Sequence, residues 1–347
     1  MKKILGLMVA LLIAFATLVG CTQKDTKVEE AEVSTTEATE EATTTEPEKV
    51  SMRFGNTQGD KDTQSMGLAE VKRRMEEETN GNFQIELYFS SALGGTDDLT
   101  EQAMQGAPIL TVSDPGRLAS FVPEFGVIQA PYLLDDPSQL NKLVETETYK
   151  AWEKEFEDQG LKLITSNWYS GARNMVVDKE INTPADLNGL KIRTIGSPLF
   201  TETINAMGAI ATPMDWAEVY PSIQQKAIDG AEVQTPSSYA TRLYEISKYT
   251  NKTEHFQLIG CLVMSKEVFD SWSTEYQELF VRICKEVGAE NQKLVVKLSK
   301  EYEDEMVEQG MIVREVDKTP FIEAVQPVYE KLGYAELRDQ LLEEISK

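Results

Sequence analysis

The chain has 347 residues and carries 34 Lys+Arg against 58 Asp+Glu, a formal net charge of −24. This length suits one large or two ordinary domains with a substantial core. So acidic a chain repels phosphate backbones and anionic headgroups, which excludes nucleic acid and lipid surfaces as expected partners. Three Cys and one His are too few for a zinc cage or a disulfide scaffold, so we expect no metal and no cofactor.

The N-terminus is typical of an export signal. Lys2 and Lys3 precede an apolar run at 4–19, and residues 18–21 read Leu-Val-Gly-Cys, which resembles the cleavage box of a bacterial lipoprotein. We expect residues 1–20 to be removed and Cys21 to be lipidated, tethering the chain to the outer face of the cytoplasmic membrane. A plain transmembrane anchor is the alternative, although the apolar run is slightly short for a span.

Residues 21–50 are predicted to be a disordered acidic stalk. They are rich in Thr, Glu and Ala and contain no aromatic side chain. Such a segment buries too little apolar surface to offset the entropy lost on ordering. We therefore expect folding to begin near Ser51.

The first folded part alternates strand and helix patterns. The expected strands are 52–55, 83–89 and 107–112, and the expected helices are 65–79 and 97–105. This order predicts a mainly parallel α/β sheet with crossover helices. Ligands of such sheets lie at the carboxyl ends of the strands, so Asn56 and Ser113, which follow the first and third strands, are expected to line a cleft.

Two arginines stand out in the next part, in neutral or apolar surroundings. Arg173 lies in an alternating segment at 172–177, and Arg193 lies near the end of a strand pattern at 190–195. Gly196 ends that strand, and Ser197 is expected to cap a helix beginning at Pro198. A carboxylate at this helix N-terminus would receive a two-pronged contact from Arg193. The alternative is an ordinary solvated surface arginine.

The remaining pattern is mostly helical. Asp215 with Glu218 matches a capping box, which predicts a helix at 215–230 with Trp216 at its start, either over a ligand or in the core. Further elements are expected at 136–160 (helix), 161–164 and 258–264 (strands), 273–309 (long helix), 311–316 (strand) and 319–346 (helix). His255 is expected at a hinge or on the surface, and Cys261 and Cys284 are expected to be buried, with a disulfide between them left open.

Several motifs occur in a specific order. They are GAR at 171–173, DLNGLKIR at 186–193 and MDWAEVYPSIQQKAIDGAE at 214–232, preceded by TNGNFQIELYFSSALGG at 79–95 and FVPEFGVIQAPYLL at 121–134. This order resembles the substrate-binding proteins of TRAP (tripartite ATP-independent periplasmic) transporters, DctP type, over roughly 52–254. The resemblance implies a two-lobed, periplasmic-binding-protein-like α/β fold with mixed, mainly parallel sheets, a ligand cleft between the lobes and a long helix spanning both. Lobe I would comprise 51–170 plus about 259–298, and lobe II 171–258 plus about 299–347.

The resemblance also implies roles for individual residues. Arg193 would pair with the ligand carboxylate, Arg173 would be the second anion contact, and Trp216 would pack on the ligand. Sugar-acid binders of the family carry Asn where this chain has Val233, and often where it has Gly196, which suggests a smaller or more apolar acid unless Gln234 compensates. The full set of expected ligand-binding residues is Arg193, Arg173, Trp216, Gly196, Val233, Gln234, Asn56, Ser113, Trp168, Met214 and Tyr239.

These observations predict an extracytoplasmic solute-binding lipoprotein that captures a small organic anion, a carboxylate, and delivers it to integral membrane permease subunits. A binding protein of another transporter class or of a sensor kinase is one alternative. An exported enzyme is another, but the chain has no nucleophile elbow, no HExxH motif and a single His, so we expect no enzymatic activity. An inert surface lipoprotein is a third. The identity of the carboxylate is left open.

Overall fold

The computed structural model describes residues 48–134 and 136–346. The predicted export signal, the lipidation site at Cys21 and most of the predicted stalk lie outside these residues. The stalk prediction ended slightly too late, because the first strand starts at Val50 and the Tyr276 hydroxyl donates to the Glu48 carbonyl at 3.1 Å. Within the described ranges, no helix combines the length and apolar character needed to cross a bilayer.

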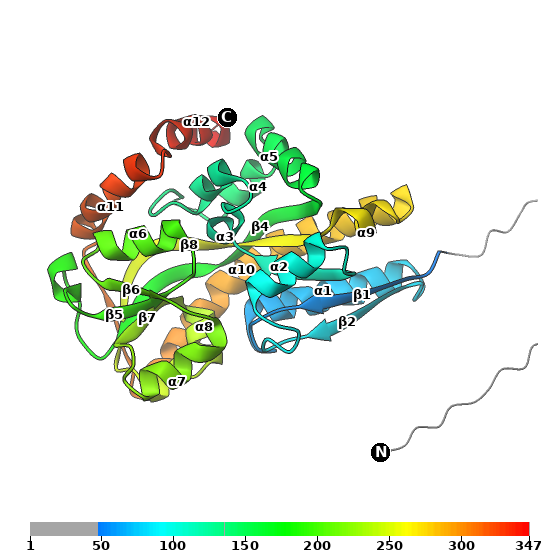
Figure 1. Cartoon of the computed structure of the whole chain (residues 1–347). Coiled ribbons are helices and arrows are strands. Elements are labelled where there is room, and N and C mark those ends of the chain that lie inside the picture. The colour runs from blue at the N-terminus through cyan, green and yellow to red at the C-terminus, as the bar shows by residue number, and fades with distance from the viewer. Residues whose placement is uncertain (1–47, 135, 347) are drawn as a thin grey trace, which may run out of the picture. The chain divides into compact units, whose positions relative to one another are not determined.

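The described strands form one nine-stranded mixed sheet (Figure 1). They are β1 (Val50–Gly55), β2 (Phe83–Tyr88), β3 (Ile109–Ser113), β4 (Leu161–Val177), β5 (Lys191–Thr194), β6 (Ile210–Pro213), β7 (Gly230–Gln234), β8 (Tyr249–Ser265) and β9 (Ile312–Glu315). Their order is β2-β1-β3-β8-β4-β7-β5-β6, with β9 paired to β8. Pairing is parallel at each end of the sheet, whereas β8 is antiparallel to β3 and β4, and β4 is antiparallel to β7. The predicted α/β class is confirmed.

Helices cover this sheet and follow most of its strands. The α-helices are α1 (Thr63–Glu78), α2 (Thr96–Met104), α3 (Pro115–Leu118), α4 (Gln139–Leu143), α5 (Glu147–Asp158), α6 (Pro198–Ala206), α7 (Val219–Gln224), α8 (Thr235–Ala240), α9 (Lys266–Asp270), α10 (Thr274–Glu308), α11 (Thr319–Lys331) and α12 (Ala335–Ser346). Short 3-10 turns are η1 (Pro123–Gln129), η2 (Pro184–Leu187), η3 (Trp216–Glu218) and η4 (Leu243–Glu245).

The two longest strands, β4 and β8, run side by side through the middle of the sheet. The sequence predicted two separate strands at 161–164 and 172–177, but β4 is continuous across both. The residues between them are nearly all buried, because β4 is covered by α10 on one side, and a buried strand shows no alternation for a pattern to detect. Register shifts along the β4–β8 ladder take up the irregularity.

The long helix α10 confirms the pattern predicted at 273–309, with the Ser273 hydroxyl accepting from the Tyr276 backbone N–H at its start. It contacts α1, β4, α8 and β9, so it runs from the helix that follows β1 to the helix that follows β7 (Figure 1). Gly288 lets it approach β4 closely. A Cβ added there would lie 2.3 Å from Asn167 Oδ1 and 2.6 Å from Trp168 Cδ1, so a larger residue would push the helix away.

The apolar side chains gather in three clusters. One surrounds β1–β3, α1 and the first half of α10, and another lies under β7, α7 and the end of α10. The largest contains Phe125, Tyr149, Phe200 and Phe321, so it draws on segments assigned to both predicted lobes. The two-lobed fold is supported by the solved structures described below, while the lobe boundaries stay a prediction. Cys261 and Cys284 are buried, as predicted, and both are free thiols.

Three predicted helices are shorter or broken. The predicted helix at 215–230 is wrong beyond Gln224, because the chain turns there and enters strand β7 at Gly230. The predicted helix at 136–160 is two helices, α4 and α5, and the one at 319–346 is divided at Gly333, whose φ of +73° suits glycine. In each case helical spacing continued across a turn that the apolar pattern did not reveal.

Candidate ligand-binding site

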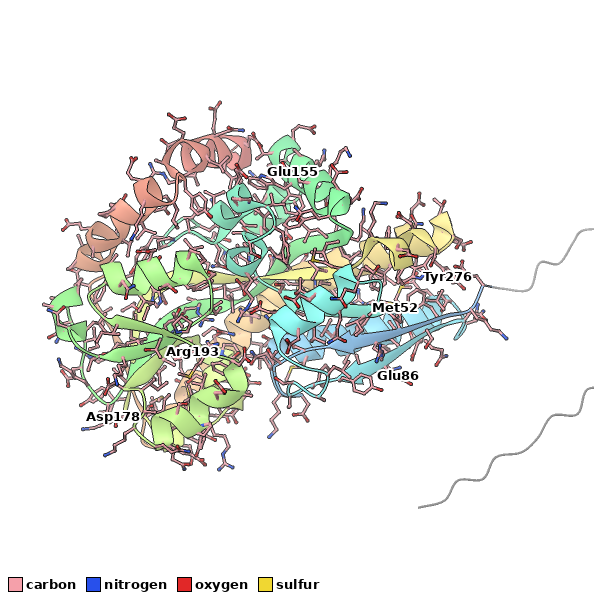
Figure 2. The ribbon with its side chains drawn as sticks, viewed as in Figure 1. Met52, Glu86, Glu155, Asp178, Arg193 and Tyr276 are labelled. Atoms are coloured by element: carbon pink, nitrogen blue, oxygen red, sulfur yellow. The ribbon has the colours of Figure 1, made fainter. Side chains whose placement is uncertain are left out.

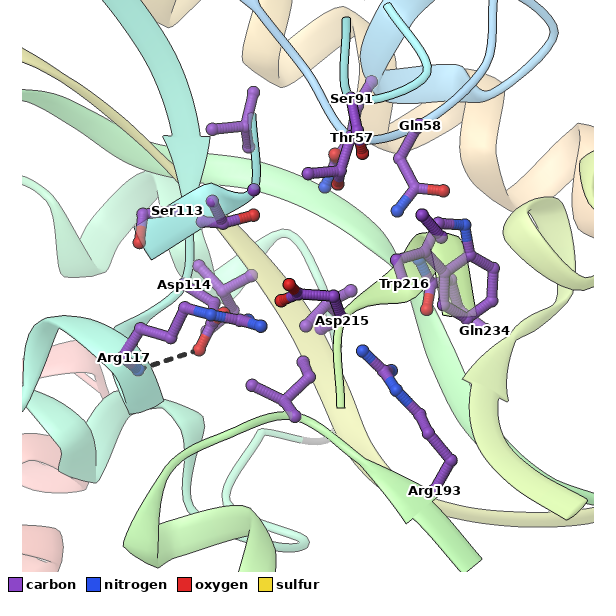
Figure 3. A pocket seen from close by; sticks show the side chains of 18 of the residues that line it. Thr57, Gln58, Ser91, Ser113, Asp114, Arg117, Arg193, Asp215, Trp216 and Gln234 are labelled. Atoms are coloured by element: carbon purple, nitrogen blue, oxygen red, sulfur yellow. Dashed lines mark hydrogen bonds and ion pairs between the residues drawn. The ribbon is translucent and has the colours of Figure 1, made fainter. Parts of the chain in front are cut away.

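A cavity of about 180 Å³ opens where the ends of β3, β5 and β7 and the interior of β4 and β8 meet the loops after β1 and β2. Figure 3 shows several of its polar side chains pointing into it. The lining residues are Thr57, Gln58, Gln64, Ser91, Gly94, Gly95, Thr96, Val112, Ser113, Asp114, Arg117, Arg173, Arg193, Ile195, Asp215, Trp216, Ala217, Gln234, Leu258 and Ile259.

Arg193 is the cation of this cavity that lacks an anionic partner among the described residues. It is 2% exposed and lies near the end of β5 (Figure 2). Nε and Nη2 donate to the Met214 carbonyl at 3.1 and 2.9 Å, which leaves three of its five N–H groups available. Trp216 lies 5.3 Å from the guanidinium, within cation–π range. Burial, with a smaller contribution from the charge of Arg173, lowers the pKa of Arg193 to about 9.

Arg173 also lines the cavity and is 2% exposed, but its charge is already compensated. Antiparallel pairing of β4 with β7 places it opposite Gln234, whose Oε1 accepts from Nη1 at 2.8 Å. The remaining contacts go to Glu232. Nε forms an ion pair with its carboxylate, and Nη2 donates to the Glu232 carbonyl at 2.6 Å and to Oε1 at 2.7 Å. Arg173 therefore has fewer donors to offer a ligand than Arg193.

Glu232 is fully buried behind the two arginines, and the sequence analysis did not identify it. Its carboxylate also accepts from the Thr194 hydroxyl at 2.8 Å and lies 3.6 Å from His255 Nε2. Burial is the largest single influence and would raise the pKa of Glu232, but the charge of Arg173 together with the hydrogen bonds from His255 and Arg173 outweighs it and holds the pKa at about 2. The prediction that His255 lies at a hinge or on the surface is wrong on exposure, because its ring is buried beside Glu232.

We expect the stability contributed by the ionised Glu232 to fall as the pH decreases from about 4.5 toward 2. The pKa is lower in the folded protein than in the unfolded chain, so the unfolded chain takes up the proton first and is favoured by acid. The difference between a pKa of 4.5 in the unfolded chain and about 2 in the folded protein corresponds to about 3 kcal/mol in the free energy of unfolding. Urea unfolding of the wild type and Glu232→Gln at pH 3, 4, 5 and 7 tests this. The difference in unfolding free energy should narrow in acid, and a constant difference would contradict it.

A chain of buried hydrogen bonds continues from Gln234 to the start of α1. Gln234 Nε2 donates to Ser237 Oγ at 2.6 Å, and Ser237 Oγ donates to Asp62 Oδ2 at 2.6 Å. Gln64 Nε2 donates to Ser170 Oγ at 2.7 Å beside it. These contacts connect α1, predicted to belong to lobe I, with α8 of predicted lobe II. Burial raises the pKa of Asp62, with the hydrogen bonds opposing this shift.

Arg117 is a third cavity arginine that the sequence analysis missed. It forms ion pairs with Asp114 at 2.6 Å and with Asp97 at 3.0 Å, and Figure 3 marks its contact with Asp114. Two carboxylates therefore compensate a single guanidinium. The Asp114 side chain also accepts from the Arg117 backbone N–H at 3.0 Å, which fixes the start of α3.

Seven of the eleven predicted site residues lie at the cavity or beside it. Arg173, Arg193, Trp216, Gln234 and Ser113 line it. Met214 takes part through its carbonyl, which holds Arg193. Gly196 lines an adjoining cavity that shares Ser113 and Arg117 with the first. Whether these residues contact a ligand remains a prediction.

The structure places the other four elsewhere. Trp168 is a core residue whose Nε1 donates to the Cys284 carbonyl at 2.9 Å, and Asn56 is buried with Nδ2 donating to Ser65 Oγ at 3.1 Å. Tyr239 stacks on Tyr302 with ring centroids 4.1 Å apart. Val233 packs in a core cluster and does not line the cavity, so the prediction that this valine makes the pocket more apolar is wrong. On a strand, neighbouring side chains face opposite ways, and Gln234 takes the cavity side instead.

Ser197 and Asp215 were predicted to cap helices through their side chains, and neither does so. Neither Ser197 nor Asp215 accepts a capping hydrogen bond from its helix through its side chain. The Ser197 hydroxyl is buried without a partner among the described residues, and the Asp215 carboxylate enters the cavity lining. The motif that resembles the family included Asp215, but it did not predict that the carboxylate points into the cavity, because the backbone of the turn sets that direction.

The model of "Bacterial extracellular solute-binding protein, family 7" (DctP) matches residues 54–336. The chain belongs to the DctP family. It is therefore a TRAP-type solute-binding protein, as its motifs predicted. Among curated relatives, it is 27% identical to the 2,3-diketo-L-gulonate-binding periplasmic protein YiaO of Escherichia coli over 79% of this chain and 84% of that protein.

Solved structures of TRAP solute-binding proteins share the fold. One from Ochrobacterium anthropi with bound L-fuconate is 30% identical, with a TM-score of 0.83 over 86% of this chain and 99% of that chain. An apo open structure from Escherichia fergusonii is 34% identical, with a TM-score of 0.73 over 84% and 99%. The DctP-family chain is thus geometrically more similar to the ligand-bound structure, although its sequence is more similar to the open one.

Proposed function

We propose that this protein captures a small organic acid outside the cytoplasm and delivers it to the membrane permease subunits of a TRAP-type transporter. The observation that carries the proposal is Arg193. A guanidinium that is 2% exposed and forms no ion pair among the described residues lines an internal cavity with three N–H groups still available. A buried charge without a counter-charge is unfavourable, so a ligand carboxylate would stabilise it.

The neighbouring groups suit this role. Met214 holds the guanidinium through its carbonyl, and Trp216 covers one face, so the N–H groups keep one direction. Arg173 adds positive potential without presenting a free charge. Closing the two lobes would remove the arginine–carboxylate pair from water and strengthen it.

Two further observations support a binding protein that closes on its ligand. The greater similarity to the fuconate-bound structure than to the open one is consistent with a closed arrangement. The hydrogen-bond chain from Asp62 through Ser237 to Gln234 would hold that arrangement. Export and lipid anchoring through Cys21 form part of the proposal and rest on the sequence of the first 21 residues.

A thermal-shift screen tests the proposed function. We expect at least one small organic acid, among monocarboxylates, dicarboxylates, keto acids, sugar acids and aromatic acids, to raise the melting temperature by several degrees. A ligand at 100 times its Kd adds about 2.7 kcal/mol to the free energy of unfolding. Uncharged analogues with the carboxylate replaced by an amide serve as controls. If no acid shifts the melting temperature, or if the amides act equally well, organic-acid capture through Arg193 is wrong.

A further inference from the structure

An acidic side chain lines the same cavity that is proposed to receive an acid. Asp215 is largely exposed at the mouth, and among the described residues it has no ion-pair partner. Its neighbours in sequence both contact Arg193, Met214 through its carbonyl and Trp216 through its ring. The Asp215 carboxylate is therefore held at the Arg193 end of the cavity without neutralising it.

The other charges of the lining are compensated. Arg173 is paired with Glu232, and Arg117 is paired with Asp114 and Asp97. In the described part of the chain, this leaves one cavity cation and one cavity anion without an ionic partner, Arg193 and Asp215. A ligand thus meets one positive and one negative position.

Asp215 reaches across the cavity mouth. A Cβ added to Gly95, at the start of α2, would lie 3.6 Å from Asp215 Oδ1, so the carboxylate lies against the opposite wall. Figure 3 shows it between the guanidinium groups of Arg117 and Arg193. A ligand that places a carboxylate on Arg193 and extends toward the mouth would bring its distal end to Asp215.

We infer that Asp215 is a specificity-determining residue that selects acids with a single negative charge and a hydrogen-bond donor, a hydroxyl or ammonium group, at the distal end. This inference rests on the proposed function. A second carboxylate or a phosphate there would be repelled by Asp215, whereas a hydroxyl or ammonium group would donate to it. Thr57, Gln58, Ser91 and Thr96 also line the cavity and would offer hydroxyl and amide groups to such a ligand.

Matched ligand pairs test the inference. Galactonate and galactarate, and gluconate and glucarate, differ only in whether the distal carbon is a hydroxymethyl group or a second carboxylate. In calorimetry with the purified full chain, we expect the monocarboxylate of a pair to bind at least about tenfold more tightly, as expected for like charges a few ångströms apart. In Asp215→Asn, the ratio of the two Kd values should fall about tenfold, through tighter binding of the dicarboxylate.

Glu218→Gln is the matched control, because it removes one exposed negative charge three positions along without altering the cavity lining. It should leave the Kd ratio unchanged, and melting curves should show that all variants fold. Equal binding of both members by the wild type, or an unchanged ratio in Asp215→Asn, overturns the inference and leaves organic-acid capture standing. If no acid of either pair or of the wider screen binds, the proposed function fails and the inference fails with it.

Discussion

Replacing Arg193 with alanine should weaken ligand binding by about 2–5 kcal/mol, or about 30-fold to several thousand-fold in Kd. The variant would leave a buried ligand carboxylate facing the Met214 carbonyl and Trp216 without a counter-charge. Calorimetry with the acid found by thermal shift measures the effect. Unchanged affinity would refute the arginine–carboxylate contact.

Two matched variants separate loss of the contact from loss of the fold. Arg193→Met keeps most of the side-chain volume and should lose affinity as alanine does. It should not lower the stability of the ligand-free protein, because the charge it removes has no anionic partner among the described residues. Arg193→Lys keeps the charge but not the planar fork and should fall in between. A large loss of stability in Arg193→Met would indicate a structural role instead.

Replacing Glu232 with glutamine should destabilise the ligand-free protein by about 3–5 kcal/mol at neutral pH, the usual effect of removing one partner of a buried ion pair. Arg173 would remain buried, having lost its counter-charge while keeping its hydrogen bond to Gln234. The Thr194 hydroxyl would no longer donate its hydrogen bond to a charged carboxylate, and His255 would lose the negative charge that lies 3.6 Å from its Nε2. Urea denaturation at pH 7 measures the difference in unfolding free energy.

The double variant Arg173→Met with Glu232→Gln provides the control for this pair. With both charges removed, no buried charge remains uncompensated at this position, so the double variant should be more stable than Glu232→Gln alone. Its ligand affinity should decrease less than that of Arg193→Ala, because Arg193 is intact. If the double variant were the least stable of the set, the destabilisation would come from lost packing rather than from the unpaired arginine.

Sequence reasoning captured what depends on local patterns. The strand–helix order of the first 60 folded residues, the length of α10 and the position of Arg193 at the end of β5 all follow from apolar spacing, turn residues and helix signals. The motif order predicted the family. These features were accessible because each is determined by residues close together in the chain.

The sequence alone thus determined the α/β class, the family and the place of Arg193 near the end of β5. The tertiary structure decided which charges are already paired. Arg173 pairs with Glu232 because β4 lies next to β7 in the sheet. The Asp215 side chain lines the cavity and does not cap η3, because the turn before η3 points it away from the helix N-terminus. Contacts between residues about 60 positions apart depend on strand register and side-chain direction, which composition and spacing leave undetermined.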